Sequence, residues 1–165
     1  QAGDEKGLPS NEVKGYKAAE WHRVADLSAF STGRQRTKRT VYEQTSRRML
    51  SDSRFLLQHG RWHSAVYLGG YTVECKLKAS VCEYLGVDVL PPAFHTHELQ
   101  VLLRSAGLAE ALQRELSLWA CFRRIDVTWD VEIRYSRKPY GRHEAETFLD
   151  DIRRVVKWLD TMILH

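Results

Sequence analysis

The sequence predicts an all-α fold, an up-and-down bundle of four to five core helices that follows an N-terminal arm. The strongest evidence is in residues 62–85 and 142–163, where apolar side chains recur at three- and four-residue spacing, the period of a helix. The connections between the predicted helices are short, and short connections place consecutive helices side by side. At 165 residues and 43% hydrophobic, the chain can form one domain with a substantial core.

The first forty residues are predicted to lie outside this core. Residues 1–10 are polar and contain glycine and proline, which is typical of a flexible tail. Residues 11–29 show only a weak helical pattern, and residues 31–40 (STGRQRTKRT) indicate a linker. We therefore expect two parts, an arm of residues 1–40 that is partly flexible or helical, and a helical bundle of residues 41–165.

The bundle is expected to begin with two long helices. Residues 41–59 form the first, and Gly60 follows its end. Its apolar members are Tyr42, Met49, Phe55, Leu56 and Leu57. Residues 62–85 form the central helix, because apolar residues cover most of its circumference. Gly69 and Gly70 lie in the middle of this helix, where small residues permit a neighbour to pack closely.

Three further elements are expected between the long helices. Residues 86–96 form a loop with two prolines, and Thr96 can cap a helix whose apolar stripe ends at Gly107. Another helix is expected over residues 109–125. Residues 127–135 alternate between apolar and polar, which is the period of a strand. Because no second strand is predicted, this segment is interpreted as an extended stretch or a distorted helix.

Residues 142–163 give the clearest helical pattern in the chain, with acidic residues early and a continuous polar face. Its apolar stripe is expected to pack on the central helix. The residues predicted to be buried together are Val66, Val73, Leu77, Phe148, Ile152, Val155 and Leu159.

The net charge of +4 and the pI near 9.0 arise from local basic clusters. These clusters are residues 34–39, 47–48, 123–124 and 134–143. Such clusters suit an anionic partner, although they are also compatible with an ordinary solvated surface.

The cysteine pattern bears on the compartment. Cys75 and Cys82 lie seven residues apart on one predicted helix, about 10 Å along its axis, which is too far for a disulfide. A reducing, cytoplasmic setting is therefore expected. No run of about 18 apolar residues could span a membrane, and no apolar signal core stands at the N-terminus.

Four side chains of the central helix share one face. Tyr67, Tyr71, Glu74 and Lys78 are spaced so that they line up, and Glu74 precedes Lys78 in the order that favours an ion pair. The pair is either structural, or Glu74 orients an arginine or a substrate hydroxyl. Tyr71 and Lys78 are included among the candidate ligand-binding residues, and Glu74 among the catalytic ones.

The stretch IRYSRKPYGRHEAE, residues 133–146, is the main candidate site. Its arginines supply bidentate forks for phosphate, and the N-terminus of the following helix favours anions. A histidine there can move a proton in attack of a 2′-hydroxyl on RNA phosphate. The alternative is a basic surface loop without function. The candidate ligand-binding residues of this loop are Arg134, Tyr135, Lys138 and Arg142, and the candidate catalytic residues are Arg137 and His143.

Metal and cofactor sites are not expected. His95, His97 and Glu98 are close in sequence, but the chain contains no HExxH or CxxC spacing. His97 is instead interpreted as a residue that packs against or caps its helix. A glycine-rich phosphate loop is also absent from the sequence.

Three motifs together resemble HEPN domains, the helical domains named for higher eukaryotes and prokaryotes nucleotide-binding. These are HGRWHSAVYLGGYTVECKLKAS (59–80), HTHELQVLLRSAGL (95–108) and IRY (133–135), followed by the amphipathic last helix. The resemblance covers residues 41–163. It implies a bundle that dimerises with two sites near the two-fold axis, and either metal-independent cleavage of RNA or binding of RNA or nucleotides. The cleaving members carry an arginine, four to six residues of any type and then a histidine.

This chain departs from that signature. Eight residues separate Arg134 from His143, whereas five separate Arg137 from His143, with Lys138 where a small polar residue is more usual. The resemblance therefore implies a module that binds RNA or a nucleotide through the basic loop, in a prokaryotic defence or toxin–antitoxin setting. One alternative is a metal-independent endoribonuclease toxin that uses Arg137 and His143. Another is a protein-interaction module with a nucleotidyltransferase antitoxin as its partner.

Overall fold

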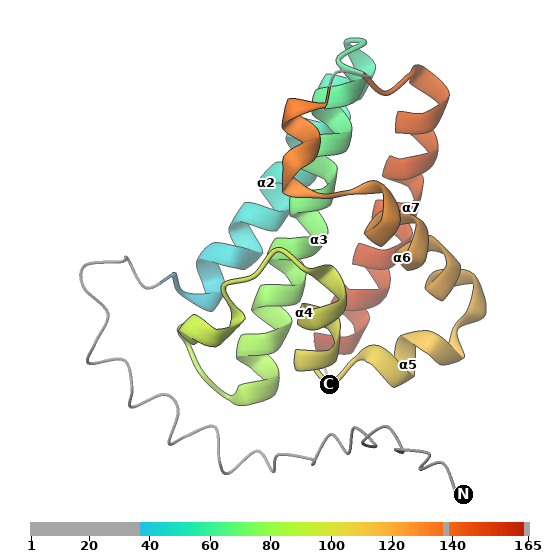
Figure 1. The fold of residues 1–165 in the computed structure, drawn as a ribbon. Coiled ribbons are helices and arrows are strands. Elements are labelled where there is room, and N and C mark those ends of the chain that lie inside the picture. The colour runs from blue at the N-terminus through green and yellow to red at the C-terminus, as the bar shows by residue number, and fades with distance from the viewer. Residues whose placement is uncertain (1–36, 137–138, 164–165) are drawn as a thin grey trace, which may run out of the picture. The chain divides into compact units, whose positions relative to one another are not determined.

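Two long antiparallel helices, α2 (Arg39–Gln58) and α3 (Trp62–Leu85), run side by side through the computed structural model, which describes residues 37–136 and 139–163 (Figure 1). A third long helix, α7 (Arg142–Ile163), lies beside α3. The remaining elements are η3 (Pro92–Phe94), α4 (Leu99–Ser105), α5 (Ala109–Arg114), α6 (Leu116–Thr128) and η4 (Val131–Tyr135). The described residues contain no β-strand, so the predicted all-α bundle is confirmed.

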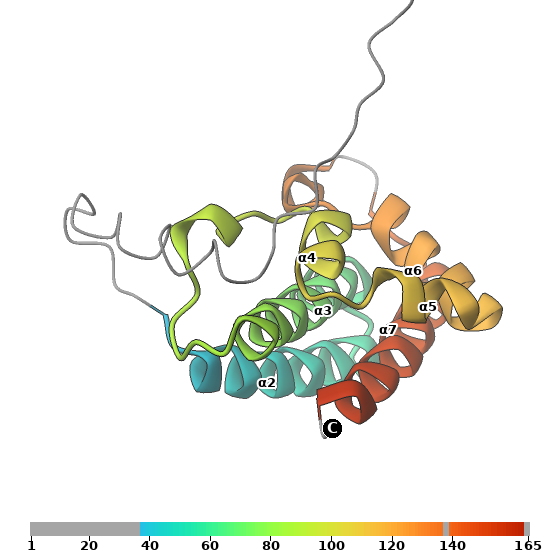
Figure 2. The ribbon, with the colours of Figure 1, turned by 90° about the horizontal axis from the view of Figure 1, so that it is seen from below.

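Helix α3 is the central element. It packs against α2, α4 and α7, and Figure 2 shows these three helices around it. Every residue from Thr72 to Cys82 is buried, including the polar ones, which agrees with an apolar pattern around most of the helix. All seven residues predicted to be buried together have less than 5% of their surface exposed: Val66, Val73, Leu77, Phe148, Ile152, Val155 and Leu159. The bounds predicted for α3 and α7 are also those of the structure.

The prediction was wrong for the segment between α4 and η4. The single helix expected over residues 109–125 is two helices, α5 and α6, with a break at Glu115, whose ψ of 76° is not helical. The segment of residues 127–135 combines the two alternatives: α6 runs to Thr128, Trp129 and Asp130 are extended, and η4 follows. The hydroxyl of Thr96 accepts a hydrogen bond from the N–H of Glu98 (3.1 Å), just before α4 begins.

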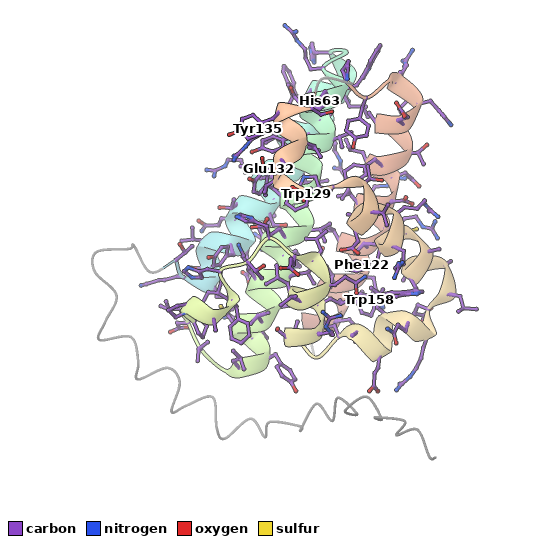
Figure 3. All side chains as sticks on the ribbon, viewed as in Figure 1. His63, Phe122, Trp129, Glu132, Tyr135 and Trp158 are labelled. Atoms are coloured by element: carbon purple, nitrogen blue, oxygen red, sulfur yellow. The ribbon has the colours of Figure 1, made fainter. Side chains whose placement is uncertain are left out.

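The segment that carries η4 is fixed onto the first half of α3. The indole N–H of Trp129 donates to the carbonyl of Tyr67 (2.9 Å), and Nε2 of His63 donates to the carbonyl of Ile133 (2.9 Å). The ring of His63 also stacks on Tyr140, with 5.6 Å between centroids. Figure 3 shows His63, Trp129 and Tyr135 gathered around η4 and this part of α3. These contacts determine where Arg134 is placed.

Candidate functional site

A line of polar side chains follows one face of α3, half-buried at Tyr67 and Tyr71 and buried at Glu74 and Lys78, and it continues onto η4 and the loop before α4. It consists of Arg134, Tyr67, Tyr71, His97, Glu74 and Lys78, and we name it the α3 polar row. Each member is within hydrogen-bond or ring-contact distance of the next. Tyr67, Tyr71, Glu74 and Lys78 come from one helix face, as their spacing predicts.

Glu74 is the buried centre of the row. Only 4% of its side chain is exposed, and its two oxygens have different partners. Oε1 accepts from the ammonium of Lys78 (2.7 Å), and Oε2 is 2.8 Å from Nδ1 of His97. The predicted ion pair with Lys78 is therefore present. A buried carboxylate requires such partners, because an unpaired charge in the interior is strongly unfavourable.

Two tyrosines connect Glu74's end of the row to Arg134. The hydroxyls of Tyr67 and Tyr71 are 3.2 Å apart, and the ring of Tyr71 meets those of Trp129 and His97 edge to face. Burial, followed by the hydrogen bond with Tyr67, raises the pKa of Tyr71 well above its ordinary value. The Tyr71 hydroxyl, which is protonated at neutral pH like that of an ordinary tyrosine, can donate a hydrogen bond.

Arg134 is the exposed cationic end of the row. One of its terminal nitrogens donates to the hydroxyl of Tyr67 (3.4 Å), and its guanidinium lies 4.7 Å from the ring centroid of Tyr135. The carboxylate of Glu132 is 4.0 Å away, at the limit of an ion pair. Arg134 is thus oriented by neutral aromatic groups more than by an acid, so its charge can still meet an anion. Tyr135 is 69% exposed beside it.

The start of α7 holds the other predicted residues in a different arrangement. Arg142 pairs with Glu146 (2.9 Å), and the N–H of Gly141 donates to the carboxylate of Glu144 (2.8 Å). One backbone donor at this helix start is therefore occupied by the chain's own acid. His143 is exposed, and it makes no hydrogen bond or ion pair with another described residue.

The structure therefore brings together some of the predicted site residues. Arg134, Tyr71, Glu74 and Lys78 belong to the α3 polar row, with Tyr135 beside it. Among the described residues, no hydrogen bond, ion pair or ring contact joins Arg142 or His143 to this row. Arg137 and Lys138 lie outside the described residues, so the proposed pair of Arg137 and His143 stays a prediction.

His97 is the site residue that the sequence interpretation missed. Its expected role was to pack against or cap a helix, but it faces Glu74 from the loop before α4. The cluster of two histidines and a glutamate in HTHE was the available signal. The partner lies 23 positions earlier, and spacing alone does not identify it.

Within residues 37–136 and 139–163, no group of three or more His, Cys, Asp or Glu side chains could hold a metal ion. None of the helices in that part is long and apolar enough to cross a membrane.

The comparisons with known proteins agree with the fold. A family model described as the HEPN domain matches residues 42–162, from the start of α2 to the end of α7. Comparisons with curated proteins and with solved structures found no match. The family is associated in general with functions that involve RNA or nucleotides. Since the match covers well over half of the chain, the protein belongs to the HEPN domain family.

Proposed function

We propose that this HEPN domain binds RNA or a nucleotide, with Arg134 as the principal phosphate ligand. The observation that supports this most is the setting of Arg134, an exposed guanidinium oriented by Tyr67 and Tyr135 and only distantly approached by an acid. A guanidinium presents a planar fork that matches two phosphate oxygens. A fork held in place before binding loses less conformational freedom when the phosphate arrives.

The residues around Arg134 can contact the base and the ribose of a nucleotide whose phosphate Arg134 binds. Tyr135 exposes most of its ring and can stack on a base, an interaction that tolerates any sequence. The hydroxyls of Tyr67 and Tyr71 offer hydrogen bonds to ribose or phosphate oxygens. Arg137 and Lys138 follow directly in sequence and add positive charge to the same segment. Together these groups suit a single-stranded ligand better than a duplex, whose bases are stacked inside.

The other predicted ligands take different parts in this proposal. Lys78 is 8% exposed and bound to Glu74, so we assign it to holding that carboxylate. Arg142 is paired with Glu146 but exposed, so it can exchange this partner for a phosphate. The prokaryotic defence or toxin–antitoxin setting and a nucleotidyltransferase partner stay predictions from the family resemblance.

The test is a binding titration with a fluorescently labelled single-stranded RNA oligonucleotide, followed by competition with ATP. Arg134→Ala should weaken binding about tenfold or more, since a hydrogen bond to a charged group contributes about 1.5–3 kcal/mol. Arg134→Lys, which keeps the charge but loses the fork, should have an intermediate affinity. Arg114→Ala removes an exposed arginine of α5 that pairs with Glu110, and it serves as the matched control.

The outcomes separate the possibilities. Displacement of the RNA by ATP at similar concentrations would identify a nucleotide site, whereas weak displacement would identify an extended RNA site. If Arg134→Ala binds as tightly as the unmodified protein, phosphate recognition by Arg134 is wrong.

A further inference from the structure

The outer face of α2 carries a hollow that has no part in the proposed function. Helix α2 lies at the edge of the bundle, where it packs mainly on α3 (Figure 2). The hollow has a volume of about 400 Å³, and it is lined by Arg47, Leu50, Ser51, Arg54, Phe55 and Gln58. These positions fall at i, i+3, i+4, i+7, i+8 and i+11, so they share one face of the helix, which we name the α2 outer face.

Two apolar side chains belong to this face. Phe55 is 59% exposed, and its ring lies against that of His59 one turn later, with 4.0 Å between the ring centroids. Leu50 is half-buried. Burying a largely exposed aromatic ring against another protein removes a large apolar area from water, and aromatic side chains are common anchors of protein interfaces for that reason.

Two arginines give the α2 outer face its charge. Arg47 and Arg54 are exposed, and neither makes an ion pair with another described residue. Glu43, one turn before Arg47, is half-buried and does not pair with it. The two arginines are seven residues apart, which is two helical turns and about 10 Å along the axis. Within the described part of the chain, the face thus presents two positive charges without a carboxylate to neutralise them.

We propose that the α2 outer face docks an acidic amphipathic helix of a partner protein. A helix that lies along α2 and carries two carboxylates seven residues apart presents them at the interval of Arg47 and Arg54. Each guanidinium can then form a bidentate pair with one carboxylate. Apolar side chains between the two carboxylates meet Leu50 and Phe55. The seven-residue interval reads the same in both directions, so a parallel and an antiparallel helix both satisfy it.

Two other occupants fit the α2 outer face less well. In a two-fold contact of this face with a second copy of itself, Arg47 and Arg54 of both chains would bring four positive charges into one small interface, which is unfavourable. For RNA, a continuous path from Arg134 would be needed. Within the described residues, no hydrogen bond, ion pair or ring contact joins the α2 outer face to the α3 polar row. The combination of an exposed aromatic ring and regularly spaced arginines therefore favours an acidic helix.

The experiment measures the binding of fluorescein-labelled peptides to the full chain by anisotropy. The probe is an alanine-based peptide of about 20 residues, long enough to be helical, with two glutamates seven positions apart and two leucines between them. The comparison peptide has lysine at both glutamate positions. The unmodified chain should bind the glutamate peptide about tenfold or more tightly than the lysine peptide, because like charges across the interface oppose binding of the latter.

Substitutions on α2 show whether this face is the site. A variant with both Arg47→Glu and Arg54→Glu should prefer the lysine peptide. Phe55→Ala should weaken binding of the glutamate peptide about tenfold, the effect of truncating an anchor residue. The matched control combines Arg123→Glu and Arg154→Glu, two exposed arginines of α6 and α7 without an ion pair to another described residue, and it should keep the original preference. An unchanged urea midpoint verifies that each variant is folded.

Other results would overturn the proposal. If the two peptides bind equally, or if the preference survives the reversal of Arg47 and Arg54, the α2 outer face does not recognise an acidic helix. If the glutamate peptide does not bind and the reversal lowers affinity for labelled single-stranded RNA, the two arginines belong to an RNA site. If the peptide does not bind and the reversal changes the mass found by light scattering, the face lies between two copies of the chain.

Discussion

The indole of Trp129 occupies the space that a side chain at Gly70 would need. A β-carbon placed on Gly70 would lie 2.0 Å from Cδ1 of Trp129, a distance that no pair of carbons in contact can have. Since Trp129 also donates to the carbonyl of Tyr67, the end of α6 is anchored directly on α3. The position of η4, and of Arg134 on it, therefore depends on the absence of a side chain at Gly70.

Gly70→Ala should destabilise the fold and displace Trp129. Inserting a methyl group into a packed contact costs about 1–3 kcal/mol, which exceeds the gain of about 1 kcal/mol from replacing glycine in a helix. Gly69→Ala is the control, because its β-carbon would meet only the ends of Leu149 and Phe148, at 3.3 Å. Urea unfolding should show a larger loss of unfolding free energy for Gly70→Ala than for Gly69→Ala. Equal losses would contradict the contact described.

The core centred on α3 gives a second prediction. Leu77 is fully buried, and truncating it leaves a cavity between the long helices. Leu77→Ala should lower the free energy of unfolding by about 2–5 kcal/mol. Leu116→Ala, at a leucine that is 79% exposed, should change it by less than about 0.5 kcal/mol. Similar effects of the two changes in urea unfolding would show that α3 is not the centre of the core.

The buried thiols predict a loss of stability at alkaline pH. Burial raises the pKa of Cys75 to about 12 and that of Cys82 to about 11, from an ordinary value of 9.0. The unfolded chain therefore loses these protons at lower pH than the folded one. The stabilising contribution is complete below about pH 9 and is lost as the pH rises through 11 to 12.

Urea unfolding at pH 8 and pH 10.5 measures this effect. The midpoint should fall at the higher pH, and Cys75→Ala should show a smaller fall than the unmodified chain. A fall that is identical in Cys75→Ala would assign the alkaline loss to other groups.

The family resemblance also predicts a homodimer with residues 133–143 near the two-fold axis. Light scattering at micromolar concentration should give twice the 19.1 kDa mass of the chain. A cysteine introduced at Tyr135, which is exposed on η4, should form a disulfide across the axis under oxidation. A cysteine at the exposed Glu110 of α5 is the matched control and should not. A monomer at these concentrations would contradict the predicted dimer.

The long helices could be predicted from sequence because their signals are local and continuous. The stripe of α7 extends over its whole length. Gly86 follows the end of α3, and its φ of 65° is the left-handed conformation that glycine adopts readily. The break at Glu115 has no such signal, since neither glycine nor proline occurs there. The alternation over residues 127–135 combines the last turn of α6, a short extended stretch and η4, and so imitates a strand.

Within the candidate site, Arg134 and Tyr135 were predicted from the basic loop, but side-chain contacts could be predicted only along one helix. The face shared by Tyr71, Glu74 and Lys78 follows from the helical period. The contacts of His97 with Glu74 and of Arg134 with Tyr67 join residues 23 and 67 positions apart. They depend on the path of two irregular segments, one before α4 and one after α6, which no spacing rule determines.

The salt dependence of RNA affinity tests phosphate binding by Arg134 most directly. Affinity for a labelled single-stranded RNA should fall linearly with salt on logarithmic axes, and each phosphate contact contributes a slope of about 0.7. Arg134→Ala should weaken binding and make the slope shallower by about that amount, whereas Arg114→Ala should leave both unchanged. An affinity that does not change with salt concentration would contradict the account. So would an Arg134→Ala variant whose slope and affinity equal those of the unmodified protein.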